Sequence, residues 1–136
     1  MDAHSDFLVI DDDDINNFVC KLLIKGITGT DNVKAFTSPE KGIEYIENEY
    51  TKSDHKRKTL VLLDINMPCL SGWEVLKIFD KFSETVKKQF SIYILSSCIR
   101  ETEIAKILAN KYAKGCIEKP LTSEKLSELM LGLSAN

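Results

Sequence analysis

The sequence predicts an α/β domain in which helices cover both faces of a five-stranded parallel sheet. Two observations lead to this prediction. Short apolar runs recur along the chain, and segments with apolar residues at helical spacing separate them. Apolar runs of about four to eight residues that end on polar residues are typical of strands buried on both faces of a parallel sheet. The alternation implies five βα units joined by right-handed crossovers.

The first unit begins at the apolar run 7–10, which predicts a strand. Apolar residues at helical spacing then predict a helix from Ile15 until Gly26 and the Thr28-Gly29 break. A short second strand is expected at 33–36.

The second helix has a clear start signal in the run Ser38-Pro39-Glu40. It supplies an N-cap, a proline at the first helical position and an acid in the first turn. The polar segment 48–58, with its basic cluster at 55–58, is expected to form a solvated loop before the third strand; recruitment of an acidic partner by the cluster is the less favoured alternative.

The third and fourth units follow the same pattern. The apolar runs 60–63 and 92–95 predict strands, and a helix between them should start near Ser71-Gly72 and carry apolar residues as far as Phe82.

The last part of the chain completes the sheet. Ile104 and Leu108 mark a fourth helix, and the segment 115–118 predicts the fifth strand. Thr122 should cap a final helix that contains Leu126. We expect residues 1–136 to form a single domain with an ordered core at about 6–133.

Composition excludes several classes of protein. The apolar fraction is 43%, the charged fraction 29% and the net charge −3, without a cluster of basic residues of the kind that binds nucleic acid. The acidic N-terminus is no signal peptide, and no apolar stretch reaches the roughly 18 residues of a membrane span. We therefore expect a cytoplasmic protein that binds neither nucleic acid nor membrane. The cysteines are widely spaced and are expected to be reduced thiols: Cys20, Cys69, Cys98 and Cys116.

Charged and hydroxyl side chains follow the predicted strands at their carboxyl ends. Asp11 and Asp12 follow the first strand, Asp64 the third, Ser96 the fourth and Lys119 the fifth. Ligands of parallel α/β sheets bind at this edge, so these side chains are expected to share one site.

The chemistry of that site favours a metal ion and a phosphoryl group. Close carboxylates repel one another, and Mg²⁺ prefers one or two carboxylates together with waters and phosphate oxygens. A hydroxyl and an ammonium group would neutralise and hydrogen-bond phosphoryl oxygens, and a carboxylate can itself form an aspartyl phosphate. Asp13 and Asp14 fit the start of the following helix better, because the helix dipole favours negative charge there.

The chain resembles the response-regulator receiver domain, the CheY-like phosphoacceptor of two-component signalling, and in particular its stand-alone members. The segments that carry the resemblance extend from Phe7 to about Leu133. They are Val9-Ile10-Asp11-Asp12-Asp13, Leu63-Asp64-Ile65-Asn66-Met67-Pro68-Cys69-Leu70-Ser71-Gly72, Leu95-Ser96-Ser97 and Lys119-Pro120. The resemblance implies a flavodoxin-like (βα)5 fold with strand order 2-1-3-4-5.

The resemblance also implies a role for each site residue. Asp64 would be the phosphoacceptor that becomes 4-aspartylphosphate, and Ser96 and Lys119 would be the switch hydroxyl and the phosphoryl-binding lysine. Mg²⁺, with Mn²⁺ as a substitute, would be held by Asp12, Asp11, Asp64 and the backbone carbonyl of Asn66. Lys119-Pro120 resembles the family's cis peptide.

The partners implied are a sensor histidine kinase or a histidine phosphotransfer protein as phosphodonor. An unknown downstream protein would bind the face formed by the fourth helix, the fifth strand and the fifth helix, and a phosphorylation-dependent homodimer is a further expectation. The protein would promote its own phosphorylation and dephosphorylation without being a turnover enzyme on a separate substrate. The chain has no Walker-type loop, so ATP is not the expected donor.

One residue departs from the family pattern and leaves an alternative open. Cys116 occupies a position that is often Tyr or Phe, so an aromatic switch at this point is in doubt. The alternative function is a pseudo-receiver, an interaction module that keeps the fold and does not switch. A haloacid-dehalogenase-like phosphatase is set aside because the pattern of that family is Asp-x-Asp, and here the residue two positions after Asp64 is Asn66. A flavin carrier with the same strand order is a further possible function. The acidic first loop argues against it, because it would repel the phosphate of the cofactor.

Overall fold

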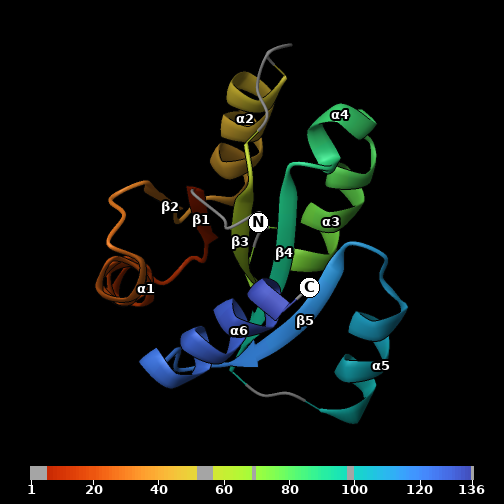
Figure 1. Ribbon diagram of the computed structural model, residues 1–136. Helices are drawn as coiled ribbons and strands as arrows, with labels where there is room; N and C mark the ends of the chain where they lie inside the picture. The colour runs from red at the N-terminus through yellow and green to blue at the C-terminus, as the bar shows by residue number, and fades with distance from the viewer. Residues whose placement is uncertain (1–5, 52–56, 69, 98–99, 136) are drawn as a thin grey trace.

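A computed structural model describes residues 6–51, 57–68, 70–97 and 100–135 of the chain. Its side chains are described as far as residue 131. Its sheet has five parallel strands in the order β2-β1-β3-β4-β5 (Figure 1). The strands are β1 Asp6–Ile10, β2 Val33–Phe36, β3 Thr59–Asp64, β4 Phe90–Ser96 and β5 Ala113–Glu118. The predicted fold class and strand order are both confirmed.

Six helices connect and flank the strands in the described part of the chain. They are α1 Asp14–Thr28, α2 Pro39–Tyr50, α3 Gly72–Asp80, α4 Glu84–Lys87, α5 Glu101–Ala109 and α6 Ser123–Ala135. The short helix α4 was not predicted, and the helices that the sequence ranks as fourth and fifth are therefore α5 and α6.

Two apolar layers hold these helices on opposite faces of the sheet (Figure 1). On one face, α1 and α6 bury Ile24 and Leu126 against β1, β3 and β4. On the other, residues of α2, α3 and α5, such as Ile43, Leu76 and Ile107, pack on the same strands. Both faces of the central strands are therefore buried, which explains why their sequences are continuous apolar runs.

Side chains at the helix ends fix where most of the helices begin. Asp13 accepts hydrogen bonds from two backbone N–H groups at the start of α1, and Ser38 caps α2 ahead of Pro39. The Ser71 hydroxyl caps α3 by accepting from the Glu74 N–H, and the Glu74 carboxylate accepts from the Ser71 N–H, which completes a capping box. The Thr122 hydroxyl accepts from the Lys125 N–H and caps α6 as expected.

Helices α2 and α3 end at other residues than the sequence predicts. Helix α2 continues to Tyr50, because that side chain is buried and its hydroxyl bonds the Thr59 hydroxyl at 2.8 Å. The polar segment after it therefore starts later than expected. Helix α3 ends at Asp80, so Phe82 lies in the turn before α4 and its ring packs edge-on against Phe79.

Arg57 is not the solvated residue that its basic cluster predicts. Its guanidinium forms an ion pair with Asp6 at 3.2 Å and lies 4.2 Å from the centre of the Tyr50 ring. This pairing ties the segment before β3 to the start of β1. The rest of the basic cluster, apart from Lys58, lies outside the described residues, as do Cys69 and Cys98. Within the described ranges, no helix has the length and apolar character needed to span a membrane.

Candidate functional site

The carboxyl ends of β1, β3 and β5 bring together three of the predicted acids and the predicted lysine. Lys119 Nζ lies 2.8 Å from Asp11 Oδ2 and 3.5 Å from Asp64 Oδ2. Ligand oxygens of Asp11, Asp12 and Asp64 all lie within 4.8 Å of one another. Asp11 is fully buried and Asp64 is 3% exposed, whereas Asp12 faces solvent. The register explains this meeting, since Ile10 of β1 pairs with Leu63 of β3, directly before each acid.

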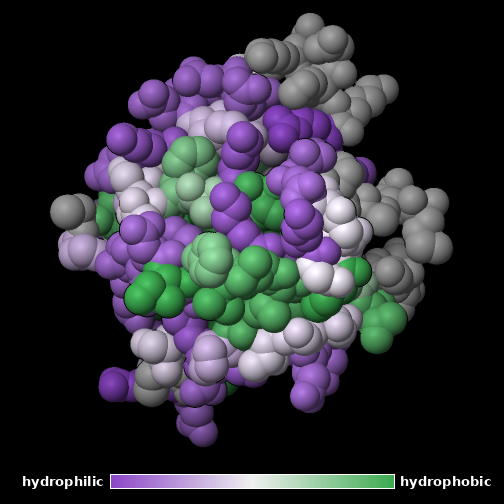
Figure 2. All heavy atoms as spheres, turned by 90° about the vertical axis from the view of Figure 1, so that its left-hand side faces the viewer, coloured by the Kyte–Doolittle hydropathy of each residue, from purple (hydrophilic) through white to green (hydrophobic). Residues whose placement is uncertain are grey.

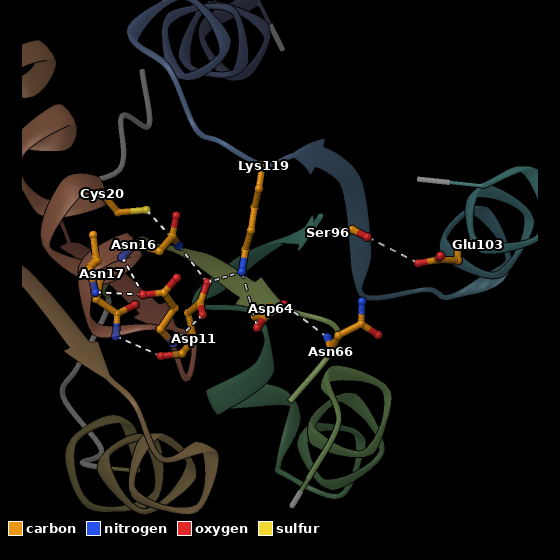
Figure 3. Close-up of polar contacts among 11 residues, drawn as sticks. Asp11, Asn16, Asn17, Cys20, Asp64, Asn66, Ser96, Glu103 and Lys119 are labelled. Carbon is orange, nitrogen blue, oxygen red and sulfur yellow. Dashed lines mark hydrogen bonds and ion pairs between the residues drawn. The ribbon is translucent and has the colours of Figure 1, made fainter. Parts of the chain in front are cut away.

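Asp11 is held in place by donors from the start of α1 (Figure 3). Its Oδ1 accepts from the backbone N–H of Asp13 at 2.8 Å, and its Oδ2 accepts from Asn16 Nδ2 at 2.7 Å as well as from Lys119. The Asn17 amide donates to the Asp11 carbonyl at 2.9 Å. These donors fix the orientation of the Asp11 carboxylate within the cluster.

Asn16 and Asn17 have no functional role in the sequence prediction. Their spacing from Asp11 places one side chain on the carboxylate and the other on the backbone of the same residue. A signal for them exists in the sequence, because amides one turn into a helix can reach back to a polar group that precedes it.

Asp64 occupies an electrostatically unfavourable position. Burial, and then the charge of Asp11, raises the pKa of Asp64 to about 7, although the backbone N–H of Asn66 and the ammonium of Lys119 oppose this shift. The Asn66 N–H donates to Asp64 Oδ1 at 3.2 Å. A further positive charge near Asp64 would stabilise the charged form of this carboxylate.

Lys119 responds in the opposite way to the same cluster. Burial alone would lower its pKa, but the hydrogen bond to Asp11 and the charges of Asp11 and Asp64 outweigh burial and raise it. The lysine is therefore a firmly charged group. Its backbone N–H donates to the Ser96 carbonyl at 2.8 Å, and the Lys119–Pro120 peptide is cis, as predicted.

Gly72 allows α3 to start directly against the end of β3. A Cβ atom at this position would lie 2.6 Å from the Asp64 carbonyl oxygen and 2.9 Å from Ile65 Cα, closer than atoms can pack. The Gly72 N–H donates to the Ile65 carbonyl at 3.1 Å. The glycine of the predicted Asp64–Gly72 motif therefore supports the backbone that carries Asp64.

The three acids supply the oxygen ligands that a hard divalent cation requires. Mg²⁺ accepts one or two carboxylates and completes its octahedron with other oxygens and water. The chemistry of this donor set fits Mg²⁺ better than a softer metal, because no described cysteine or histidine joins the cluster.

Ser96 is close in the sheet but its hydroxyl has a different neighbour. The residue is 1% exposed at the end of β4, and Oγ lies 3.5 Å from Glu103 Oε2 (Figure 3). In this view the hydroxyl points away from Asp64. The structure thus gathers Asp11, Asp12, Asp64 and Lys119 within direct reach of one another, whereas the Ser96 hydroxyl is directed to Glu103. Cys116 is half-buried on β5, opposite Ile94.

This fold, with an acidic cluster and a lysine at the carboxyl edge of its sheet, defines a CheY-like α/β signalling domain. Receiver domains of this class bind Mg²⁺ at an acidic pocket, interact with histidine kinases or phosphotransfer proteins, and act as phosphoacceptors rather than as classical enzymes. The family model for the response regulator receiver domain matches residues 7–131 of the sequence. The chain therefore belongs to that family.

Solved structures agree with this assignment. A two-component response regulator from Cytophaga hutchinsonii is 27% identical, with 99% of this chain and 100% of that chain covered and a TM-score of 0.85. A response regulator receiver protein from Dyadobacter fermentans is 26% identical, with 92% and 94% covered and a TM-score of 0.81. No curated protein matches the sequence.

Proposed function

We propose that this receiver accepts a phosphoryl group on Asp64 from a phosphohistidine of a histidine kinase or phosphotransfer protein. The observation that carries the proposal is the position of Asp64, a nearly buried carboxylate within 3.5 Å of an ammonium group and beside two further acids. An Asp64 oxygen would form the new bond to phosphorus, and the P–N bond would break with its electron pair left on the donor imidazole. Later attack by water would release inorganic phosphate and restore the carboxylate.

Each side chain of the cluster has a proposed part in this reaction. Mg²⁺, held by Asp12, Asp11, Asp64 and the carbonyl of Asn66, would neutralise negative charge on the acids and the phosphoryl oxygens. Lys119 would exchange its contact with Asp64 for one with a phosphoryl oxygen. Positioning and charge neutralisation of this kind account for most catalysis of phosphoryl transfer.

A band of apolar side chains on α1 provides a docking surface for the phosphodonor. Ile15 is 75% exposed and Phe18 62%, and Val19 and Leu22 extend the same stripe along the helix. Figure 2 shows this hydrophobic band on the face that carries α1. The stripe starts directly after the acids at the end of β1, so a protein bound to it could bring an imidazole to Asp64.

The face formed by α5, β5 and α6 is the proposed output surface. A groove of about 420 Å³ lies on it, lined among others by Tyr93, Cys116 and Leu129. A downstream protein or a second phosphorylated copy could bind there.

Labelling by a small phosphodonor tests the acceptor. Incubation with phosphoramidate and Mg²⁺ should add one phosphoryl group to the native protein, detected as intact mass, and none to Asp64→Asn. Asp14→Asn is a matched control, since Asp14 is an exposed aspartate of the first turn of α1. A labelled Asp64→Asn protein would place the acceptor elsewhere. A native protein that gains no phosphoryl group would favour a non-switching interaction module.

The docking surface has a separate test. Phe18→Lys should leave phosphoramidate labelling at the native rate, because Phe18 lies outside the acidic cluster. The same variant should slow transfer from the fastest donor in a panel of purified phosphorylated histidine kinases. Equal slowing of both reactions would mean that the substitution damages the site rather than the docking surface.

A further inference from the structure

The Ser96 hydroxyl is directed toward the carboxylate of Glu103 rather than toward Asp64. Ser96 ends β4, and Glu103 belongs to the first turn of α5. Ser96 Oγ donates to Glu103 Oε2 over 3.5 Å (Figure 3). Strand β4 and helix α5 are therefore connected through the Ser96 hydroxyl, the group that the resemblance to receiver domains implies as the switch hydroxyl for a phosphoryl group on Asp64.

A hydroxyl has a single proton and can donate it to one acceptor at a time. Ser96 therefore cannot hydrogen-bond Glu103 and a phosphoryl oxygen on Asp64 together. The backbone of Ser96 is fixed, because the residue pairs with Glu118 of β5 and its carbonyl accepts from the Lys119 N–H. The exchange of acceptors thus requires rotation of the Ser96 side chain between staggered rotamers, with the strand staying in place.

The negative charge of Glu103 also opposes contact between Ser96 and a phosphoryl group. Among the described residues no lysine or arginine forms an ion pair with Glu103. Its field reaches β5, where burial, followed by the charge of Glu103, raises the pKa of Cys116. A phosphoryl group that approaches Ser96 would meet this negative charge at a half-buried position, where solvent screens it incompletely.

We propose that Glu103 is a positioning residue that holds the Ser96 hydroxyl away from Asp64 until phosphorylation. The inference rests on the proposed function, because it requires a phosphoryl group on Asp64 as the competing acceptor. When Ser96 turns to that group, Glu103 loses its donor and the first turn of α5 loses this contact with β4. The contact therefore opposes phosphoryl binding and passes the change on to α5.

Affinity for beryllofluoride, a mimic of the phosphoryl group, measures this competition. Calorimetric titrations with beryllofluoride and Mg²⁺ would compare the native protein with Glu103→Ala, Glu103→Gln and the control Glu101→Ala. Glu101 is an exposed acid in the same helical turn, so its removal matches the loss of charge near the helix dipole. Glu103→Ala should bind about fivefold more tightly than the native protein, the effect of one ordinary hydrogen bond. The beryllofluoride affinity of Glu103→Gln should lie between those of Glu103→Ala and the native protein. Glu101→Ala should bind beryllofluoride as tightly as the native protein does.

The Ser96→Ala background separates the hydrogen bond from a general effect of charge. If Glu103 acts through the hydroxyl, the gain from Glu103→Ala should largely disappear in Ser96→Ala, as a double-mutant cycle would show. In the native background, Glu103→Ala without ligand should also move the amide signals of 101–105 toward their positions in the beryllofluoride complex. That spectral change is one that a purely structural role would not produce.

Three outcomes would overturn the proposal. They are equal affinities of Glu103→Ala and Glu101→Ala, an undiminished gain in the Ser96→Ala background, and amide signals of unliganded Glu103→Ala that stay at native positions. Failure of the proposed function is distinguishable, because the native protein itself would then bind no beryllofluoride and gain no phosphoryl group from phosphoramidate.

Discussion

Millimolar Mg²⁺ should stabilise the native protein, and Asp12→Asn should remove most of that stabilisation. Asp11 and Asp64 are buried, with ligand oxygens within 4.8 Å of each other. At that separation two unit negative charges repel by about 3 kcal/mol at an effective dielectric constant of about 20. Lys119 offsets part of this repulsion, and a divalent cation would offset more. Asp12 reaches the same cluster from solvent, so its oxygen is the accessible carboxylate ligand.

The size of the effect follows from mass action. At a free Mg²⁺ concentration about ten times its Kd, the free energy of unfolding rises by about 1.4 kcal/mol. For a chain of 136 residues this corresponds to a rise of about 5 °C in melting temperature. If Asp12→Asn weakens binding by about 100-fold, the same Mg²⁺ concentration stabilises the variant by only about 0.06 kcal/mol, which melting curves would not detect.

Thermal unfolding followed by circular dichroism, with and without MgCl₂, would measure these rises. Ionic strength must be held constant with NaCl, because salt alone screens the repulsion. Asp14→Asn removes the same charge three residues from Asp11 and should keep the native rise. Equal rises in Asp12→Asn and the native protein would show that the ion binds elsewhere. The absence of a rise in the native protein would refute the argument from repulsion.

Three further perturbations have defined outcomes. Lys119→Met should lower the free energy of unfolding by about 3 kcal/mol, because buried Asp11 loses its cation, and Mg²⁺ should restore part of this loss in urea titrations; an equal loss with and without Mg²⁺ would contradict this. Gly72→Ala should cost about 1–3 kcal/mol and slow phosphoramidate labelling, whereas Gly26→Ala, whose Cβ would meet nothing within 4 Å, should do neither. Burial raises the pKa of Tyr50 to about 12. Between pH values of about 10 and 12 the folded state keeps a proton that the unfolded state has lost, so stability should fall as pH rises. Comparison with Tyr50→Phe by ultraviolet titration would test this, and a Tyr50 signal that titrates at about pH 10 would contradict it.

The sheet could be predicted from sequence because its strands are buried on both faces. Runs such as 60–63 have no polar residue to obscure the pattern, and each ends on a group with recognisable chemistry. The acids and the lysine could be predicted for the same reason, since the carboxyl ends of neighbouring strands must meet at one edge. Helix α4 has a single turn, too short to give a periodic signal.

Supporting contacts between distant parts of the chain could not be predicted, because they depend on tertiary geometry rather than on spacing. The contact of Asn16 with Asp11 is local by comparison, and its position one turn into α1 could have indicated it. Glu103 meets Ser96 through the packing of α5 beside β5, and no local pattern marks it among the acids of its helix. Arg57 looks like part of a solvated basic cluster until Asp6 lies beside it.

The hydrogen bond from the Lys119 N–H to the Ser96 carbonyl has a consequence for protein engineering. Ser96 ends β4 and Lys119 directly follows β5, the strand paired with it. A change that disturbs the pairing of these strands would therefore affect the positions of both residues. Gly115 is a tight position on this pair of strands, because an added Cβ would lie 3.3 Å from the Tyr93 ring and one of the two would have to give way. A designer who wants a longer-lived phosphorylated state with unchanged signalling should therefore leave these strands alone. Asn66, a solvent-facing neighbour of Asp64, lies on a loop that carries neither Lys119 nor Ser96, so its side chain can be changed without disturbing this pair of strands.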